Sequence, residues 1–253
     1  MTFLWHLVCG AAKMAKTPTS IGGRGPAISA LDPWASSAGR IHQLLTDDER
    51  AQLVVMSSIV RFKKREIIYR EDDPAEAVFN INTGVVAAYK EAPDGREHIA
   101  AFLFVDDLFG LSAEGRYTNL AKAITDVTAY RLPVTTLRSR LSKDAELEFH
   151  VICKLCQELR QAQRHAFLLS EKRAVTKLAM FLQLMEQLQT AKGQQITEVY
   201  LPMDRSEIGN YIGMTLAAVS RAFRALTTRG VIRPRDRGHV RIVDRDAFDK
   251  IAR

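Results

Sequence analysis

The side chains best suited to bind another molecule lie in one helical stretch near the C-terminus. Leu216, Ala217, Ser220, Arg221 and Arg224 recur at helical spacing and would share one face. Short side chains on such a face permit close approach to a major groove, while Ser and Arg donate hydrogen bonds to base edges and phosphates. The face therefore predicts a contact with DNA, and its plainer alternative is a solvated basic surface.

Two short helices around a tight turn would hold that face in place. Asp204 is an N-cap residue at the start of the first helix, and Gly213 ends that helix because glycine adopts positive φ readily. Thr215 can cap the second helix, in which Val219 and Phe223 recur on the inner side. The pattern is typical of a helix-turn-helix, although such patterns also arise in ordinary helical hairpins.

The stretch resembles the DNA-binding helix-turn-helix of the CRP/FNR superfamily of bacterial transcription regulators. Leu-Pro-Met-Asp-Arg at 201–205 and Thr-Leu-Ala-Ala-Val-Ser-Arg at 215–221 are most similar to the FixK and FNR branches. The resemblance is specific here, and looser but continuous from about residue 40 to the C-terminus. It implies base contact by Arg221 and phosphate contact by Arg205. The full set of DNA-binding residues that it implies is Arg205, Thr215, Leu216, Ala217, Ser220, Arg221 and Arg224.

The chain departs from its relatives at Ala217, where FNR- and FixK-like proteins usually carry Glu. The resemblance implies a palindrome of TTGA-containing half-sites, read by two recognition helices about one DNA turn apart. Glu accepts hydrogen bonds from base amino groups, whereas the methyl group of Ala217 does not. We therefore expect altered discrimination at one base pair per half-site, with Ser220 and Arg221 preserving the remaining readout.

A β-wing is expected after the second helix. Residues 231–233 can pair with residues 240–243 across a turn at Asp236-Arg237-Gly238. Arg233, Arg235 and Arg237 of this wing would lie along DNA phosphates or form a solvated rim.

Composition agrees with a nucleic-acid partner. The chain has 253 residues, 47% hydrophobic content and a formal net charge of +7, which suits one large or two modest domains. Residues 201–253 hold eleven basic and six acidic side chains, so positive charge is concentrated where the DNA contact is expected. Three cysteines indicate a reducing compartment, and no apolar run approaches the roughly 18 residues of a membrane span. We expect a cytoplasmic protein without a membrane partner.

Short apolar runs divided by turn residues predict an all-β roll over residues 39–135. They resemble the β-roll of cyclic-nucleotide-binding domains, in which Phe-Gly-Glu holds the ribose and an Arg neutralises the cyclic phosphate. Here Leu111 stands in the Glu position, and Tyr117-Thr118 stands near the Arg position, with Arg116 as a substitute one residue away. A buried phosphate without a well-placed cation is costly, so cAMP binding is disfavoured and a roll kept as scaffold is favoured.

Other cofactors find little support in the sequence. The resemblance to FNR implies an N-terminal cysteine cluster for an iron–sulfur centre, but that region offers only Cys9. Six scattered histidines contain no His-x-His pair, which argues against a metal enzyme on the roll. No cofactor is expected, although a single His leaves haem ligation open. Cys153 and Cys156 are interpreted as buried small hydrophobes, with a redox pair as the alternative.

A long helix over 143–170 carries an apolar seam whose members step by three and four residues. Such a seam suits a coiled-coil homodimer or packing on the chain's own roll. The family resemblance, in which this helix is the dimer axis, favours the homodimer. The seam consists of Ile152, Leu155, Leu159, Ala162, Ala166 and Leu169.

These observations predict an α+β fold with a mobile arm over 1–38, a cyclic-nucleotide-binding-like β-roll over 39–135, a dimerisation helix over 143–170 and a winged helix-turn-helix over 171–253. Nothing resembles a nucleophile–base pair, so no enzyme is expected. The expected function is a transcription activator that binds double-stranded DNA as a homodimer. Family resemblance adds oxygen- or nitrogen-oxide-related control and contact with RNA polymerase. The alternatives are a cyclic-nucleotide-responsive regulator and a redox or haem gas sensor.

Overall fold

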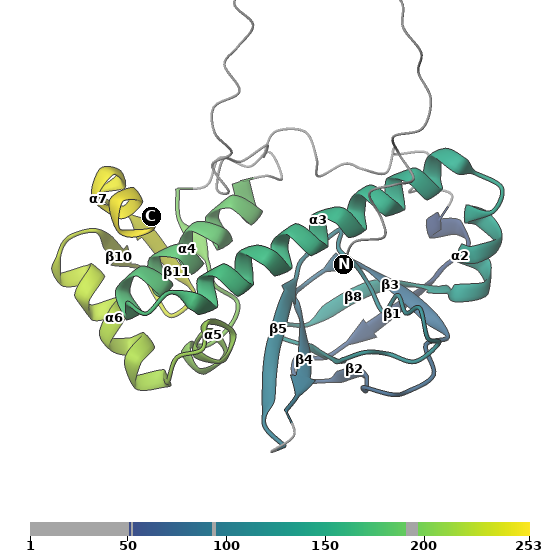
Figure 1. The fold of residues 1–253 in the computed structure, drawn as a ribbon, viewed down its shortest axis with the longest axis horizontal. Coiled ribbons are helices and arrows are strands. Elements are labelled where there is room, and N and C mark those ends of the chain that lie inside the picture. The colour runs from purple at the N-terminus through teal and green to yellow at the C-terminus, as the bar shows by residue number, and fades with distance from the viewer. Residues whose placement is uncertain (1–50, 52, 93–94, 191–196) are drawn as a thin grey trace, which may run out of the picture. The chain divides into compact units, whose positions relative to one another are not determined.

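The computed structural model describes residues 51, 53–92, 95–190 and 197–253. The arm expected over 1–38, the first residues of the expected roll and Cys9 lie outside the described residues. Along the described residues, the strands of the roll come first, the long helix follows them, and a mainly helical C-terminal part comes last (Figure 1). This order confirms the predicted α+β fold class.

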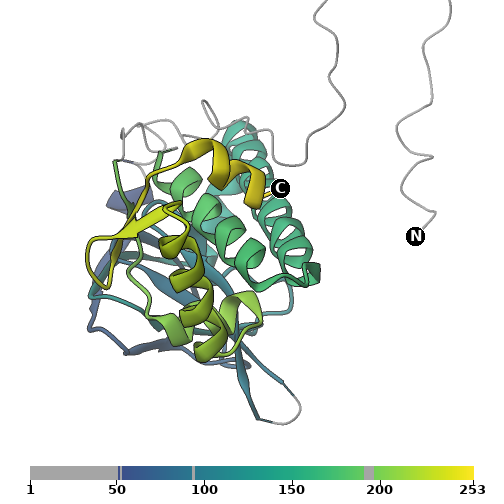
Figure 2. The ribbon, with the colours of Figure 1, turned by 90° about the vertical axis from the view of Figure 1, so that its left-hand side faces the viewer.

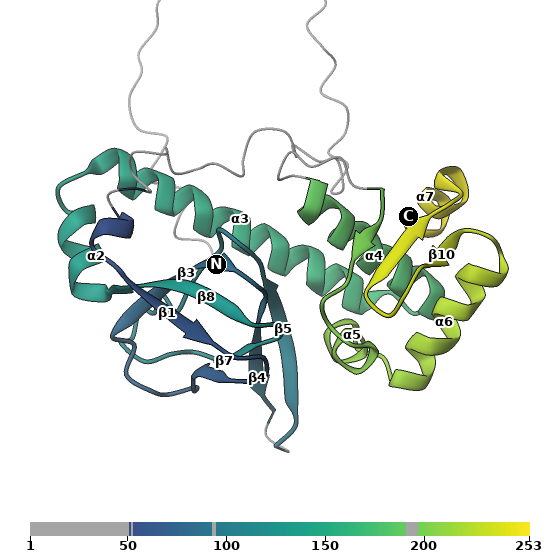
Figure 3. The same ribbon diagram turned by 180° about the vertical axis from the view of Figure 1, so that it is seen from behind.

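The roll is made of two four-stranded sheets in which neighbouring strands are antiparallel. Both sheets turn apolar side chains inward, because apolar and polar residues alternate along strands such as β7 and β8. The first sheet, seen from behind in Figure 3, has the order β1 (Ser58–Phe62), β8 (Val127–Pro133), β3 (Ala77–Thr83) and β6 (Leu108–Phe109). The second has the order β2 (Ile67–Tyr69), β7 (Leu120–Ala123), β4 (Val86–Glu91) and β5 (Glu97–Leu103).

An aromatic cluster fills the space between the sheets. Tyr69 stacks on Tyr117 with ring centroids 3.7 Å apart, and Phe79 stacks on Phe109 at 5.3 Å. All four side chains are buried, and the Tyr117 hydroxyl donates to the carbonyl oxygen of Ala77 at 2.8 Å. The cluster joins strands from both sheets and fixes the loop that precedes β7.

Three helices follow the roll, namely α2 (Val134–Leu141), α3 (Ala145–Ser170) and α4 (Ala174–Thr190). The Asp144 carboxylate caps α3 by accepting a hydrogen bond from the Leu147 amide at 3.1 Å. The 26 residues of α3 form one continuous helix (Figure 1). No helix of the described ranges is long and apolar enough to cross a membrane.

The C-terminal part packs helices around a small sheet. Its helices are α5 (Arg205–Ile212), α6 (Leu216–Thr228) and α7 (Arg245–Ile251), and its strands are β9 (Val199–Tyr200), β10 (Ile232–Pro234) and β11 (His239–Ile242). Figure 2 brings α6 and the β10–β11 hairpin to the front. Ile232 pairs with Ile242 and Pro234 with Val240, which confirms the expected wing. The third strand β9 and the helix α7 were not expected from the sequence.

Helix α5 also packs against β5, the edge strand of its sheet. The Asn210 side chain bridges two backbone groups of that strand: its Oδ1 accepts from the Ile99 amide at 2.6 Å, and its Nδ2 donates to the Glu97 carbonyl at 2.8 Å. Beside it, Phe102 meets Tyr211 with ring centroids 5.0 Å apart. The amide of Asn210 therefore satisfies groups that an edge strand leaves unpaired.

Candidate nucleic-acid interface and the cavity of the roll

The first helix of the pair, α5, begins with a capping box. The Asp204 carboxylate accepts from the amides of Ser206 and Glu207 at 2.8 and 2.9 Å, and the Glu207 carboxylate accepts from the Asp204 amide at 2.7 Å. The box satisfies amides that a helix start leaves unpaired, which fixes where the helix begins. The N-cap predicted at Asp204 is confirmed.

The turn between α5 and α6 depends on two glycines. Gly213 ends α5 in the left-handed region at φ 65°, as predicted. A β-carbon on Gly209 would lie 2.5 Å from the carbonyl oxygen of Met214, so any side chain there would collide with the backbone of the turn. The Thr215 hydroxyl then caps α6 by accepting from the Ala218 amide at 3.2 Å. The angle between the two helices is therefore set by local contacts.

Helix α6 divides into a buried and an open side. Val219 and Phe223 are buried against the rest of the C-terminal part, as the sequence predicted. On the other side Leu216 is 54% exposed, and Arg221 is exposed as well. The structure thus brings six of the seven predicted DNA-contacting residues onto one accessible face, with Ser220 partly covered. That face comprises Thr215, Leu216, Ala217, Ser220, Arg221 and Arg224.

Arg205 lies apart from this face and is half-buried. Its guanidinium carbon is 4.0 Å from the ring centroid of Phe223, so it stacks on the buried side of α6. Burial lowers the pKa of Arg205 from its usual value, and the group stays charged at neutral pH. Arg205 therefore has a packing role that its sequence position did not predict.

The wing arginines differ in what they bind. The carboxylate of Glu198 forms ion pairs with Arg235 at 2.7 Å and Arg241 at 3.0 Å, which ties the segment before β9 to the hairpin. Arg233 and Arg237 are exposed. Arg235 is thus ion-paired within the chain although its side chain is exposed, and Arg233 and Arg237 are accessible to solvent.

The apolar seam of α3 is largely uncovered within the described chain, although Leu155 also borders a cavity beside the roll. Leu159 is 61% exposed, Ile152 50% and Leu169 42%, and Phe167 beside them is 54% exposed. Apolar side chains of this size normally avoid water when they line up on one face. The six seam residues all count as exposed, namely Ile152, Leu155, Leu159, Ala162, Ala166 and Leu169.

The cysteines of α3 differ from the expectation of burial. Cys153 is half-buried, Cys156 is exposed, and both are free thiols. The reason is that the roll covers one side of α3, while most of the side that carries the seam stays open. Among the described residues, no group of three or more His, Cys, Asp or Glu side chains is placed to hold a metal ion.

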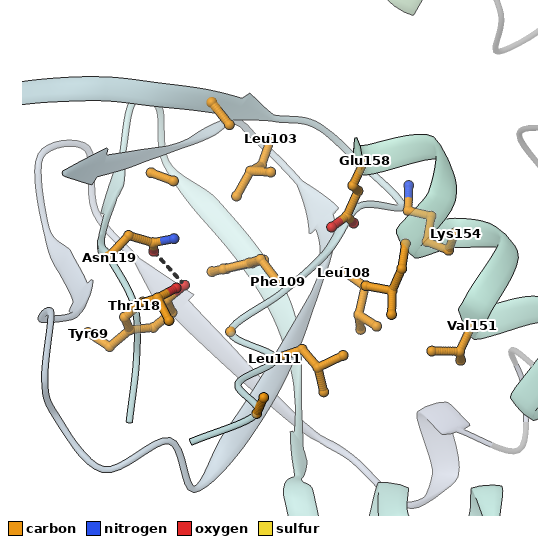
Figure 4. A pocket seen from close by; sticks show the side chains of 15 residues that line it. Tyr69, Leu103, Leu108, Phe109, Leu111, Thr118, Asn119, Val151, Lys154 and Glu158 are labelled. Carbon is orange, nitrogen blue, oxygen red and sulfur yellow. Dashed lines mark hydrogen bonds between the residues drawn. The ribbon is translucent and has the colours of Figure 1, made fainter. Parts of the chain in front are cut away.

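A cavity of about 370 Å³ lies between the roll and α3 (Figure 4). It includes Leu111 and Thr118 from the region where a cyclic nucleotide would be held. Arg116 does not line it: its Nη1 donates to the carbonyl oxygen of Asp72 at 2.6 Å on the exposed side of the loop. Tyr117 is buried in the aromatic cluster. The residues present do not fit a cyclic phosphate, because none of the described lining residues offers an uncommitted cation.

Sequence reasoning missed several residues that matter to these sites. His165 of α3 stacks on Tyr211 of α5 at 3.9 Å, and its Nε2 donates to the Tyr211 carbonyl at 2.6 Å. Burial lowers the pKa of His165 from its usual value, which favours the neutral imidazole. Glu158 and Asn119 line the cavity from opposite walls. No local pattern marks any of these residues, since their partners are distant in sequence.

Comparison with known proteins gives the same two parts. Residues 59–144 match the family described as "Cyclic nucleotide-binding domain", and residues 176–251 match "Crp-like helix-turn-helix domain". The chain is 32% identical over 191 residues to the nitrogen fixation regulation protein FixK of Azorhizobium caulinodans, a match that covers 75% of this chain and 77% of that protein. It is 34% identical over 174 residues to FixK of Bradyrhizobium diazoefficiens, covering 68% and 73%.

Solved structures extend the comparison to the fold. The structure of FixK2 from Bradyrhizobium japonicum is similar with a TM-score of 0.71 and 31% identity, covering 78% of this chain and 98% of that chain. A CRP-family regulator from Thermus thermophilus is similar with a TM-score of 0.63 at 23% identity, which bears on the fold alone.

Proposed function

Because the chain belongs to the CRP/FNR family of DNA-binding transcription regulators, we propose that it binds a palindromic promoter site as a homodimer and activates transcription there. The observation that carries the proposal is the open face of α6. Its Arg221 and Ser220 stand beside short side chains on a helix whose opposite side is buried. A helix presented in this way can enter a major groove and donate to base edges.

The homodimer is supported by the exposed seam of α3. A second copy of the same helix would bury Leu159 and its neighbours in knobs-into-holes contacts, and a two-fold axis would place two copies of α6 for two half-sites. A palindrome with half-sites about one DNA turn apart follows from that symmetry. Each half-site is expected to contain TTGA, with altered preference at the base pair opposite Ala217.

Similarity to the relatives supports the proposed activation and the proposed physiological signal. Relatives include the nitrogen fixation regulation protein FixK of Azorhizobium caulinodans and the transcriptional activator protein FnrA of Stutzerimonas stutzeri. We accordingly place this chain in the cytoplasm, in oxygen- or nitrogen-oxide-related control, with RNA polymerase as the protein that it recruits. The proposal requires neither an iron–sulfur centre nor a cyclic nucleotide. An absorption spectrum of the freshly purified protein tests the haem alternative.

Site selection tests the DNA-binding proposal. Purified full-length chain is mixed with genomic fragments, and bound fragments are sequenced and footprinted. The expected result is an enriched palindrome that protects two half-sites. Arg221→Ala serves as the matched variant, since it removes one base-reading group from a surface helix. It should weaken the enrichment and relax preference at one base pair per half-site while the protein stays folded. Enrichment of single, unpaired motifs, or none, contradicts the proposal.

A further inference from the structure

The cavity between the roll and α3 is lined mainly by apolar side chains. Its volume of about 370 Å³ lies within the range of small-molecule sites. The roll contributes one group of apolar residues and α3 closes the other side. The walls include Leu103, Leu108, Phe109 and Leu111 from the roll, and Val151 and Leu155 from the helix.

The charged groups of the cavity argue against an anionic ligand. Lys154 is the cation among the described lining residues, and its ammonium is held by Asp107 at 2.8 Å. Glu158, one helical turn further along α3, turns its carboxyl group toward the interior (Figure 4). Burial raises the pKa of Glu158 to about 7, which reflects how poorly this wall accommodates negative charge. A phosphate would meet that carboxyl group without a cation to neutralise it.

Two polar side chains face each other across the apolar space. Asn119 accepts a hydrogen bond from the Tyr69 hydroxyl at 3.3 Å through its Oδ1, which directs its amide nitrogen toward the cavity. Glu158 faces it from α3, and in its neutral form the carboxyl group can donate as well as accept. Leu111 adds a further apolar surface where an acceptor for sugar hydroxyls would otherwise stand. The carboxylate expected at position 111 for sugar hydroxyls and an uncommitted cation for a phosphate are therefore both missing from the described lining residues.

We propose that this cavity binds a neutral, mainly apolar small molecule, held by one hydrogen-bonding group between Asn119 and Glu158, and that it does not bind a cyclic nucleotide. Binding of a small molecule in this cavity does not depend on the proposed DNA site. Since Val151 and Leu155 belong to the helix that carries the seam, a molecule bound here contacts that helix directly.

Fluorescence titration with N-phenyl-1-naphthylamine tests the site. This probe is neutral and apolar, carries one N–H group, and becomes fluorescent in apolar surroundings. The full-length wild type is expected to bind it saturably, and Leu111→Glu should weaken binding at least about tenfold by adding a carboxylate to the wall. Val243→Glu places the same group on an exposed position of the C-terminal part and should change binding by less than about twofold.

Two further measurements separate the possible results. Leu103→Trp fills the cavity without adding charge, so it should also abolish probe binding. If Leu111→Glu does not fold, Leu103→Trp takes its place in the test. An excess of cAMP or cGMP should neither displace the probe nor release heat in calorimetry. The proposal is overturned if the wild type shows no saturable binding, if both folded cavity variants bind the probe as the wild type does, or if a cyclic nucleotide competes.

Discussion

The guanidinium group of Arg205 on α5 stacks on the ring of Phe223 on α6, with 4.0 Å between the guanidinium carbon and the ring centroid. The contact joins the two helices of the helix-turn-helix from the side opposite the turn. It gives Arg205 two functions that can be separated, namely packing against the ring and presenting charge near the expected DNA. Lys retains the charge but lacks the planar group that stacks.

Replacing Arg205 should therefore affect stability and DNA affinity differently. Arg205→Ala is expected to cost roughly 1–2 kcal/mol of folding free energy, by loss of the cation–π contact and of the packed stem. It should also weaken binding to all DNA sequences and flatten the salt dependence by about one unit of slope. Arg205→Lys should lose a similar amount of folding free energy but keep most of the salt dependence of DNA binding. Thermal unfolding and fluorescence anisotropy at several salt concentrations give both quantities. A salt slope that is unchanged in Arg205→Ala would mean that this arginine only packs.

The exposed Arg221 should carry base readout. Arg221→Ala is expected to cost roughly 1–3 kcal/mol on the selected site and to relax preference at one base pair. Arg229→Ala is the control, because it removes the same charge from the exposed C-terminal end of α6, away from the reading face. Binding to specific and random duplexes is compared for each variant. Equal losses on the two duplexes would assign Arg221 to phosphate contact alone.

The seam of α3 is tested by a charge placed in its middle. Leu159→Asp should weaken homodimerisation by more than about tenfold, because a carboxylate would be buried opposite the same residue of the partner helix. Gln163→Asp puts the same side chain on an exposed position outside the seam and should leave the dimer intact. Sedimentation velocity reports the oligomeric state. If Leu159→Asp sediments as the wild-type dimer, the seam assignment is wrong.

The pKa of Glu158 makes a prediction about stability and pH. Burial raises this pKa from 4.5 to about 7, opposed by Lys154 and reinforced by Asp107. The folded state thus holds the proton more tightly than the unfolded state, so the contribution of Glu158 to stability is full below about pH 4.5 and is lost as the pH rises through 7. Between pH 5 and 8 the wild type should lose about 2 kcal/mol relative to Glu158→Gln.

Chemical denaturation at several pH values measures this difference. Glu148→Gln, on an exposed position of the same helix, is the control and should follow the wild type across the range. Parallel curves for the wild type and Glu158→Gln would show that the carboxyl group is better solvated than its position in the cavity indicates.

Local features were predictable and tertiary ones were not. The caps at Asp204 and Thr215 and the left-handed Gly213 follow from interactions within a few residues, which is why the sequence predicts the helix-turn-helix closely. The wing follows for the same reason. Asn210, however, bonds to Ile99 across 111 positions of the chain, and no periodicity encodes that contact.

The cavity has the same limitation. The sequence alone shows that Leu111 replaces the Glu expected to bind the ribose. The position of Glu158 opposite Asn119, in contrast, depends on how α3 lies against the roll. The exposure of Cys156 was mispredicted because an amphipathic pattern does not tell which side of a helix its own chain covers. Family resemblance assigns the roll to nucleotide binding in general, whereas only the arrangement of the side chains tests it for this chain.

The departure at Ala217 makes the sharpest prediction about specificity. Ala217 is exposed in the first turn of α6, next to the capping Thr215, so a longer side chain there would extend from the helix without disturbing the core. Ala217→Glu adds an acceptor for base amino groups and should sharpen preference at one base pair per half-site. It also adds negative charge facing the DNA, so affinity for random sequences should fall. Ala217→Gln separates the two effects, because it brings similar size and hydrogen bonding without the charge.

Site selection is performed side by side with the wild type and both variants, and affinity for random duplex is measured by anisotropy. We expect Ala217→Glu to change both results and Ala217→Gln to change base preference alone. Identical preferences at every position in all three proteins would place residue 217 away from the bases and refute this assignment of the reading face.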